Sequence, residues 1–274
     1  MRNRLTVSSS ENRTPLLDFL ASHLAISKKK AKGLLDQRTV FVSDRRVWMA
    51  RHLLQAGDIV EIHGATVAET ALKGPLFEDA HLMVADKPVG LLSNGSDSFE
   101  ERLRQATGYP YLRAVHRLDR DTSGCLLLAK EASILESLTE LFKAHAVQKT
   151  YHVIALGGMD NRLHEIRAPV DGEPALTRVH LLDSSPLASH LKAQIVTGRT
   201  HQIRKHLALV RHPVAGDKTY ATGQLPDARL RKIPRQMLHA FSLTFPHPIT
   251  RATIRAQAPL PPDFQQALKT LRLK

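Results

Sequence analysis

A short run of charged residues stands directly before an apolar stretch near the middle of the chain. The sequence AVHRLDRDTSGCLLLAK, residues 114–130, places a histidine, two arginines and two aspartates ahead of the apolar GCLLLA. A carboxylate beside guanidinium groups stays ionised at neutral pH, so that Asp119 or Asp121 could act as a nucleophile or a general base. The residue types do not choose between the two. They also fit a surface loop whose aspartates cap backbone amides and pair with the arginines.

Further motifs surround this charged loop (residues 116–122) in a fixed order. LFEDAHLMVADKPVGLL precedes it, and it is followed by KTYHVIAL, by TGRTHQIRKHLA with HPVAGDKTYA, and by LHAFSLTFPHP. The loop sequence HRLDRDTSG resembles the signature of the RluA-type pseudouridine synthases, and the other blocks are similar to the remaining motifs of that family. Together they cover most of the chain from about Leu76 to Pro248. Several short matches in the same order are far more specific than one.

The resemblance implies a reaction and gives roles to its residues. Pseudouridine synthases break the bond between ribose and the uracil nitrogen, turn the base and rejoin it through carbon. Asp119, the first aspartate of the motif, would be the nucleophile or base, and a covalent adduct and a glycal intermediate both stay open. Arg204 would pair with this carboxylate, with Arg199 as second candidate and a phosphate contact as the alternative role of Arg204. Tyr151 would stack on the flipped base and take part in proton transfer.

The same motifs provide the expected lining of a pocket for an extruded base. By resemblance, Arg117 moves into the space that the base leaves, although neutralising Asp121 would be a simpler role. Leu238 would form an apolar wall, and core packing explains it almost equally well. The full set of substrate-binding candidates is His116, Arg117, Leu118, Thr122, Arg199, Thr200, His201, Gln202 and Leu238.

No cofactor and no metal ion are expected. The chain has no Walker loop, no dinucleotide-binding glycine pattern and no cluster of metal ligands. His201 and His206 lack the i, i+4 spacing and the carboxylate support of helical metal ligands, and His116 stands apart from both. A hydrolase based on Ser123 is disfavoured because DTSGC is not a nucleophile elbow. Cys125 is expected to be inert core.

The overall charge indicates a polyanionic partner. Lys and Arg number 39 against 26 Asp and Glu, which gives a formal net charge of +13 and an isoelectric point near 10.1. RNA is the expected partner, ribosomal RNA first and transfer RNA second. A membrane is not expected, since no signal peptide, membrane span or basic amphipathic segment stands out. The single cysteine excludes an internal disulfide and is consistent with a reduced cytoplasm. The protein is also expected to be a monomer.

The first part of the chain predicts a small separate module. Leucines at helical spacing follow Thr14-Pro15, Ser27 can cap a helix over KKKAKGLL, TVFVSDRRV predicts a hairpin, and GDIVEI predicts a closing strand. This order resembles the S-four-like RNA-binding module named for a ribosomal protein, and a generic helical cap is the alternative. If the lysines are not merely a solvated helix face, the expected RNA-backbone contacts are Lys28, Lys29, Lys30, Lys32, Arg45 and Arg46.

The predicted domains are residues 1–66 for this module, 67–75 for a linker and 76–274 for a catalytic domain. In the last of these, strands are expected at residues 81–85 and over GCLLLA, TYHVIAL, HLKAQIV, MLHAFSLTF and RATIRAQA, and helices between residues 130 and 147 and over HQIRKHLALV. Strands and helices mix without βαβ repetition. The expected class is therefore α+β, with a mixed, mostly antiparallel central sheet flanked by helices, which by resemblance is the pseudouridine synthase fold.

Two stretches depart from the family pattern. The chain is short between Tyr151 and Gly198, and SNGSD near the start of the segment from Asn94 to Tyr111 stands where the family has a His-Pro pair. Loops that grip a substrate lie in such places. These departures bear on which RNA is the target, ribosomal or transfer RNA, more than on activity. A non-catalytic RNA-binding or ribosome-assembly protein on the same fold is the alternative function, and the retained Asp119, Tyr151 and Arg204 argue against it.

Overall fold

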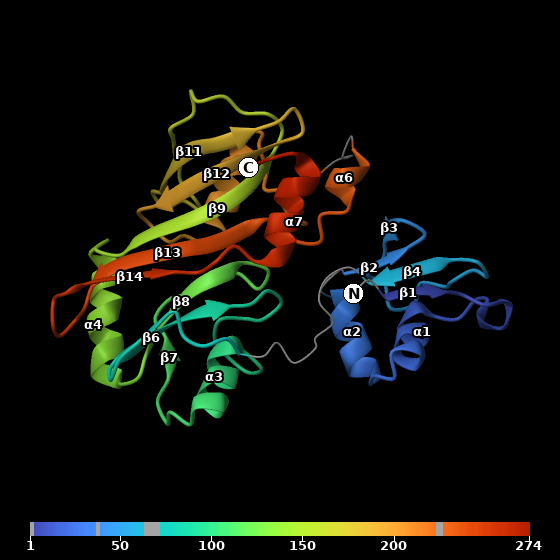
Figure 1. Cartoon of the computed structure of the whole chain (residues 1–274), viewed down its shortest axis with the longest axis horizontal. Coiled ribbons are helices and arrows are strands. Elements are labelled where there is room, and N and C mark those ends of the chain that lie inside the picture. Colours follow the sequence, from blue (N-terminus) through green and yellow to red (C-terminus); the bar gives the residue numbers. More distant parts are fainter. Residues whose placement is uncertain (1–2, 37–38, 63–71, 223–226) are drawn as a thin grey trace. The chain divides into compact units, whose positions relative to one another are not determined.

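The computed structural model of the protein describes residues 3–36, 39–62, 72–222 and 227–274. The chain divides into two units, one up to Thr70 and one from Ala71 onward. We refer to their described parts as the N-terminal unit (residues 3–62) and the C-terminal unit (residues 72–274), each seen in Figure 1. Residues 67–71 of the predicted linker lie outside the described residues.

The N-terminal unit packs two helices on a four-stranded sheet with the order β1-β4-β2-β3. Its elements are β1 Asn3–Thr6, the short 3-10 helix η1 Ser9–Glu11, α1 Leu16–His23, α2 Lys28–Asp36, β2 Val40–Val42, β3 Arg45–Arg46 and β4 Ile59–Ile62. The sequence motifs do not anticipate β1. This strand pairs with β4 at the edge of the sheet, and its sequence NRLT contains a single apolar residue, so it has no alternating hydrophobic pattern to recognise.

Local side-chain chemistry explains where the elements of this unit begin and turn. Ser27 Oγ accepts the backbone N–H of Lys30 at 3.2 Å, which is the expected helix cap of α2. Ser43 and Asp44 both have positive φ, 46° and 64°, and form the two-residue turn between β2 and β3. The predicted helix start and the predicted hairpin are therefore confirmed.

The C-terminal unit is built on a ten-stranded sheet with the order β10-β11-β12-β9-β13-β8-β6-β5, in which β14 pairs with β13 and β7 with β8. The strands are β5 Phe77–Glu78, β6 Leu82–Lys87, β7 Arg113–Ala114, β8 Ser123–Ala129, β9 Gln148–Leu156, β10 Glu165–Arg167, β11 Leu176–Ser184, β12 Ala188–Ile195, β13 Leu238–Pro246 and β14 Thr253–Gln257. The helices are α3 Phe99–Thr107, α4 Ala132–Lys143, α5 Gln202–Leu209, α6 Ala228–Arg231 and α7 Pro262–Leu271. β8 and β13 pair in parallel, while β9 pairs antiparallel with both of its neighbours, so the sheet is mixed and mostly antiparallel as predicted.

Helices cover both faces of this sheet, because successive side chains of a strand point to opposite faces. In β8, Leu126 and Leu128 pack in one cluster with α3 and α5, whereas Leu127 packs in another with α4. In β9, Val153 belongs to the α5 side and Ile154 packs with α7. The core therefore lies in layers on the two sides of the central strands.

The sequence motifs do not anticipate α3 and α7, nor the strands β10 and β11. α3 lies in the segment after SNGSD: Ser98 Oγ accepts the N–H of Glu101 at 3.2 Å and Gly108 ends the helix with φ 71°. α7 is a single amphipathic helix whose buried face includes Phe264 and Leu271. Length alone does not explain this, since α1 and α5 are shorter than either helix and are anticipated from the sequence.

Candidate active site

The charged loop connects β7 to β8 and is tied down by the last residue of β6. Lys87 is fully buried, and its Nζ donates to the carbonyl oxygens of Pro88, Leu91 and Arg120 at 2.9, 2.8 and 3.1 Å. Burial lowers the pKa of Lys87 to about 7, although the negative charge of Asp121 opposes this change. One ammonium group thus joins the turn after β6 to the backbone of the charged loop.

Two further features fix the path of the loop. Ser93 Oγ accepts the backbone N–H of Leu118 at 2.8 Å and donates to the carbonyl oxygen of the same residue at 3.0 Å. Gly124 has φ 112° and lies beside Ala240 of β13, where any Cβ would overlap the Ala240 carbonyl oxygen. The first serine of SNGSD therefore holds the loop, and the glycine allows β8 to approach β13 directly after it.

Asp119 extends from this loop and meets Arg204 of α5. Nη1 of Arg204 donates to Oδ2 of Asp119 at 2.9 Å, while Nε and Nη2 donate to the two oxygens of Asp217 at 2.6 and 2.9 Å. Arg204 and Asp217 are both buried. Burial alone would lower the pKa of Arg204, but the two carboxylates outweigh it and raise the pKa, so the guanidinium stays charged. The bidentate pair with Asp217 fixes the plane of the guanidinium and hence the direction in which it meets Asp119.

The two oxygens of Asp119 have different surroundings. Oδ2, which accepts from Arg204, also lies 3.4 Å from Nε2 of Gln236. Oδ1 faces Nε2 of His201 at 3.7 Å, and Nδ1 of that ring lies 3.0 Å from the hydroxyl of Tyr220. Burial lowers the pKa of His201, so the imidazole is neutral at neutral pH. The side chain of Asp119 is 25% exposed, and a partly exposed carboxylate that is anchored through one oxygen suits nucleophilic attack or proton abstraction.

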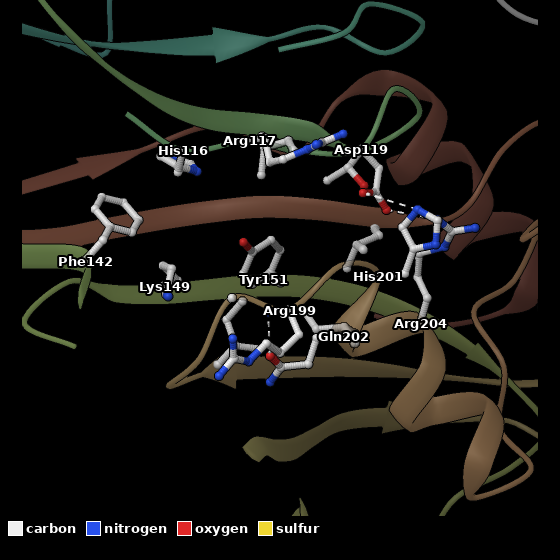
Figure 2. A pocket seen from close by; sticks show the side chains of 16 residues that line it. His116, Arg117, Asp119, Phe142, Lys149, Tyr151, Arg199, His201, Gln202 and Arg204 are labelled. Atoms are coloured by element: carbon white, nitrogen blue, oxygen red, sulfur yellow. Dashed lines mark hydrogen bonds and ion pairs between the residues drawn. The ribbon is translucent and has the colours of Figure 1, made fainter. Parts of the chain in front are cut away.

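Asp119 lies on the wall of a pocket of about 250 Å³, shown in Figure 2. Tyr151 of β9 lies in the middle of this pocket and is buried. Burial raises the pKa of Tyr151, and the negative charge of Asp119 raises it further, so the hydroxyl stays protonated. The pocket therefore combines a carboxyl group paired with a guanidinium, a protonated phenol and an aromatic face.

The structure brings nearly all of the predicted site residues to this pocket. Thr200 is an exception: it is exposed in the turn before α5 and is not among the lining residues, because neighbouring residues of a turn point in different directions. Asp121, the other candidate acid, does not line the pocket either, and its Oδ2 lies 4.0 Å from Lys218. The predicted residues that do line it are Asp119, Tyr151, Arg204, His116, Arg117, Leu118, Thr122, Arg199, His201, Gln202 and Leu238.

Gln202, predicted to bind substrate, uses its side-chain amide within the protein. Nε2 donates to the carbonyl oxygen of Leu176 at 2.9 Å, and Oε1 accepts from Thr197 Oγ1 at 2.7 Å and from the N–H of Arg199 at 3.1 Å. This amide therefore fixes the turn that leads into α5. Its contribution to the pocket is to position the turn rather than to offer an open hydrogen-bonding group.

The histidines near the pocket also have partners within the protein. Nε2 of His116 accepts the backbone N–H of Leu127 at 3.1 Å, and burial, followed by the charge of Lys149, lowers the pKa of His116 to about 4. His206 faces Thr177, with 2.9 Å between Nδ1 and Oγ1. In the described part of the chain, no three His, Cys, Asp or Glu side chains are grouped as a metal ion requires.

The basic residues predicted to contact RNA in the N-terminal unit lie on α2 and on the hairpin. Arg46 is half-buried, with its guanidinium 5.1 Å from the centre of the Phe41 ring, and Lys28 pairs with Asp18 at 2.7 Å. The residues of this set that are exposed are Lys28, Lys29, Lys30, Lys32 and Arg45. The lysines of α2 therefore form a positively charged helix face.

Sequence reasoning missed several residues that line or support the site. Lys87, Lys149 and Asp217 stand inside the motif blocks, so their presence in those blocks was an available signal. Ser93 and Gln236 lie outside the blocks. SNGSD, which begins with Ser93, is marked only as a departure from the family pattern, and nothing local marks Gln236. Their contacts reach 25 and 117 residues along the chain, so only the folded structure reveals them.

Comparison with known proteins agrees with this geometry. The family described as RNA pseudouridylate synthase matches residues 81–209. Ribosomal large subunit pseudouridine synthase C of Pasteurella multocida is 34% identical over 98% of this chain and 93% of its own length. The protein of the same name from Escherichia coli strain K12 is 30% identical over 98% of this chain and 96% of its own length. The chain belongs to the RNA pseudouridylate synthase family.

Solved structures share the fold of this pseudouridine synthase. Human RNA pseudouridylate synthase domain containing 4 aligns with a TM-score of 0.62 and 24% identity over 73% of this chain and 94% of its own. Human RNA pseudouridylate synthase domain containing 1 aligns with a TM-score of 0.55 and 24% identity over 74% of this chain and 98% of its own. The predicted family and fold class are thereby confirmed, while an RNA-binding role for the N-terminal unit stays a prediction.

Proposed function

We propose that this synthase isomerises uridine to pseudouridine in large-subunit ribosomal RNA. Relatives that match nearly the whole chain are named ribosomal large subunit pseudouridine synthase C. A net charge of +13 suits a phosphate-rich substrate. The observation that carries the proposal is the Asp119 carboxylate, held by Arg204 at 2.9 Å on the wall of a pocket of about 250 Å³.

The reaction rearranges one nucleotide without an external reagent. The bond between C1′ and N1 breaks, the base turns, and C1′ bonds to C5, while N1 gains a proton to match the one that C5 loses. Asp119 either bonds to C1′ or removes a proton from the ribose to give a glycal. Both routes need an ionised carboxylate with one accessible oxygen, and the anchoring of Oδ2 by Arg204 leaves Oδ1 in that condition.

The other pocket residues receive the base and replace it in the RNA. Tyr151 and Leu238 are buried in the pocket wall, and an extruded uracil ring packs against them. The protonated hydroxyl of Tyr151 can donate a proton or a hydrogen bond to the turning base. Arg117, exposed on the charged loop, takes the place of the base in the stack through its planar cation. Arg199 and Thr200, both exposed in the turn before α5, are expected to contact the RNA around the target nucleotide.

Mapping pseudouridine in cells with and without the gene tests this function. Carbodiimide treatment of total RNA makes reverse transcriptase stop at pseudouridine, and we expect one or a few stops in large-subunit ribosomal RNA to vanish in the deletion strain. The wild-type gene restores them. The Asp119→Asn variant does not, because a neutral amide can neither attack C1′ nor accept a proton.

Asp121→Asn is the matched control, since Asp121 lies on the same loop and does not line the pocket. This variant should restore the marks. Restoration by Asp119→Asn would contradict the assigned acid. If stops vanish only in transfer RNA, the substrate is transfer RNA. If the deletion strain keeps every stop, the protein has the synthase fold but no activity.

For the N-terminal unit we propose a phosphate-binding role. The exposed lysines of α2 form a positive helix face that can neutralise RNA phosphates whatever the sequence. Replacing Lys28, Lys29, Lys30 and Lys32 by glutamine should weaken RNA binding and flatten its dependence on salt, by a slope of roughly 0.7 for each phosphate that the variant no longer neutralises. An unchanged salt slope would contradict this role.

The remaining expectations concern location and assembly. We propose that the enzyme is a monomer and that it acts in the cytoplasm, where bacterial ribosomal RNA is made. Across the described residues, no helix combines the length and the apolar character needed to cross a membrane. Light scattering on the purified enzyme should give the mass of one chain, 30.5 kDa.

A further inference from the structure

Lys149 places a buried ammonium group in the wall of the active-site pocket. Its side chain is 6% exposed and comes from β9, two residues before Tyr151. Nζ lies 3.5 and 3.3 Å from the carbonyl oxygens of Val196 and Thr197. Both contacts are long, and no carboxylate among the described residues lies within 4.0 Å of this nitrogen. A buried charge without an acidic partner is costly and calls for an explanation.

The pocket is a slot with Lys149 and Asp119 at different ends. Figure 2 shows Lys149 beside Phe142, then Tyr151, and then Asp119 with Arg204. Residues i and i+2 of a strand lie on one face about 7 Å apart, which separates Lys149 from Tyr151. Nζ of Lys149 also lies 5.5 Å from the centre of the Phe142 ring, so an aromatic face limits this end of the slot.

The chemistry of uracil fits such a slot in both of its orientations. With C1′ at Asp119 and the ring against Tyr151, the edge of the base farthest from the sugar points toward Lys149. In uridine the ring atom opposite N1 is C4, which carries O4. In pseudouridine C5 is bonded to the sugar, and the atom opposite is C2, which carries O2. A half-turn about the axis through N3 and C6 exchanges the two, so the far edge presents a carbonyl oxygen before and after the reaction.

We propose that Lys149 donates a hydrogen bond to this far carbonyl oxygen and thereby selects uracil over cytosine. The inference rests on the proposed function. An ammonium group has three N–H donors, and the two long contacts with Val196 and Thr197 leave one to face the pocket. Cytosine would bring its exocyclic amino group to the same place, donor against donor. One fixed donor thus serves both orientations of uracil and rejects the commonest competitor.

A phosphate contact is the other role that an ammonium in an RNA enzyme could have. Burial disfavours it here, because phosphates are charged, hydrated and carried on the outside of the RNA. Arg117 and Arg199 are exposed at the same pocket and are better placed for that purpose. Burial lowers the pKa of Lys149, which strengthens its N–H groups as donors to a neutral carbonyl.

The test uses a synthetic RNA hairpin containing the uridine mapped in the deletion strain. Single-turnover rates are measured with uridine and with 4-thiouridine at that position, since sulfur accepts hydrogen bonds more weakly than oxygen. The single-turnover rate of wild-type enzyme should be lower on 4-thiouridine than on uridine. On uridine, the rate of Lys149→Met should be roughly 10- to 100-fold below that of wild-type enzyme, as expected when a charged hydrogen bond is removed. The variant should convert 4-thiouridine as fast as it converts uridine. In Lys149→Arg, which keeps a charged donor, the rate should still be lower on 4-thiouridine than on uridine, by a smaller factor than in wild-type enzyme.

Lys130→Met is the matched control for loss of a buried ammonium. Nζ of Lys130 pairs with Glu78 at 2.7 Å and does not line the pocket. This variant should lose thermal stability but keep the wild-type response to 4-thiouridine. A measurement that does not need turnover compares the affinity for the uridine hairpin with that for a hairpin carrying cytidine at the target position. Wild-type enzyme should prefer the uridine hairpin, and the ratio of the two affinities should be smaller in Lys149→Met.

The outcomes separate the inference from the proposed function. If wild-type enzyme does not convert the uridine hairpin, the proposed function fails. If wild-type enzyme converts it but the slowing by sulfur is the same in Lys149→Met, the far carbonyl is not the partner of Lys149. A loss confined to RNA affinity, with a salt slope reduced by the amount expected for about one phosphate, would assign Lys149 to the backbone and overturn the proposal.

Discussion

Nη1 of Arg204 lies 2.9 Å from Oδ2 of Asp119, and this contact joins α5 to the charged loop. The same guanidinium is clamped by Asp217, which accepts from its two other nitrogens at 2.6 and 2.9 Å. Because each of these donors has a fixed partner, the guanidinium can present Nη1 to Asp119 in one direction. Asp217 therefore sets the geometry of the acid without touching the substrate.

We expect Asp217→Asn to lower kcat by roughly 10- to 100-fold, because an amide cannot accept both hydrogen bonds and Arg204 loses its fixed plane. The free energy of unfolding should fall by about 3 kcal/mol, the usual cost of leaving a buried charge short of its partner. Single-turnover kinetics and urea unfolding measure the two effects. Asp171→Asn is the control, since Asp171 pairs with Lys205 of the same helix at 2.6 Å but is exposed. Equal losses in the two variants would contradict a specific role for the clamp.

Lys87→Met should remove a dependence of stability on pH. The pKa of Lys87 falls from 10.5 to about 7 on folding, so above pH 7 the unfolded chain binds the proton more tightly than the folded one. The contribution of Lys87 to the free energy of unfolding is therefore highest above pH 10.5, where its amine is neutral in both states, and this contribution decreases until the pH has fallen to about 7. Relative to the variant, wild-type protein should gain about 2 kcal/mol between pH 7 and 9 in urea unfolding. A constant difference across this range would refute the assignment.

The same substitution should also slow catalysis. Nζ of Lys87 donates to the carbonyl oxygen of Arg120, next to Asp119 in the charged loop, and methionine offers no donor. We expect a lower kcat with little change in RNA affinity, because the loop that carries the acid loses a hydrogen bond at its base. An unchanged kcat would show that Ser93 and the start of β8 suffice to hold the loop.

His116→Gln should make the protein more resistant to acid. The pKa of His116 is lowered from 6.5 to about 4 in the fold, where Nε2 accepts the N–H of Leu127. The stability that depends on the neutral ring is complete above pH 6.5 and is lost as the pH falls toward 4. Glutamine can accept the same hydrogen bond through Oε1 and does not titrate. Between pH 6.5 and 4 wild-type protein should therefore lose up to about 3 kcal/mol more than the variant, as followed by circular dichroism.

Gly124→Ala should destabilise the protein severely or prevent folding. The residue has φ 112°, and its Cβ would overlap the carbonyl oxygen of Ala240, where β8 meets β13. Gly108→Ala is the control: Gly108 has φ 71° and open space around its Cβ position, so it should cost only the roughly 1 kcal/mol of a left-handed alanine. Soluble yield and thermal unfolding compare the two. Similar stability of both variants would mean that the close approach of β8 and β13 is not required.

The sequence by itself determined the local elements and the kinds of chemistry. The apolar runs of β8 and β9, the Ser27 cap of α2 and the hairpin turn at Ser43 and Asp44 depend on periodicity and on neighbours a few residues away, which are present in the chain as written. The ordered motif blocks likewise provided the eleven predicted residues among the sixteen that line the pocket. β1 and α3 escaped, although β4 and α5, which are no longer than these, were recognised from the sequence.

Only the tertiary structure decided which atoms meet. Asp119 is separated from Arg204 by 85 positions and from Gln236 by 117, and these contacts exist because β8, β9 and β13 lie side by side in one sheet. That order decided that Asp119 rather than Asp121 faces the pocket, that Thr200 lies outside it, and that Asp217 clamps the arginine. Contacts between distant positions depend on how the whole chain packs, which no local pattern of residues specifies.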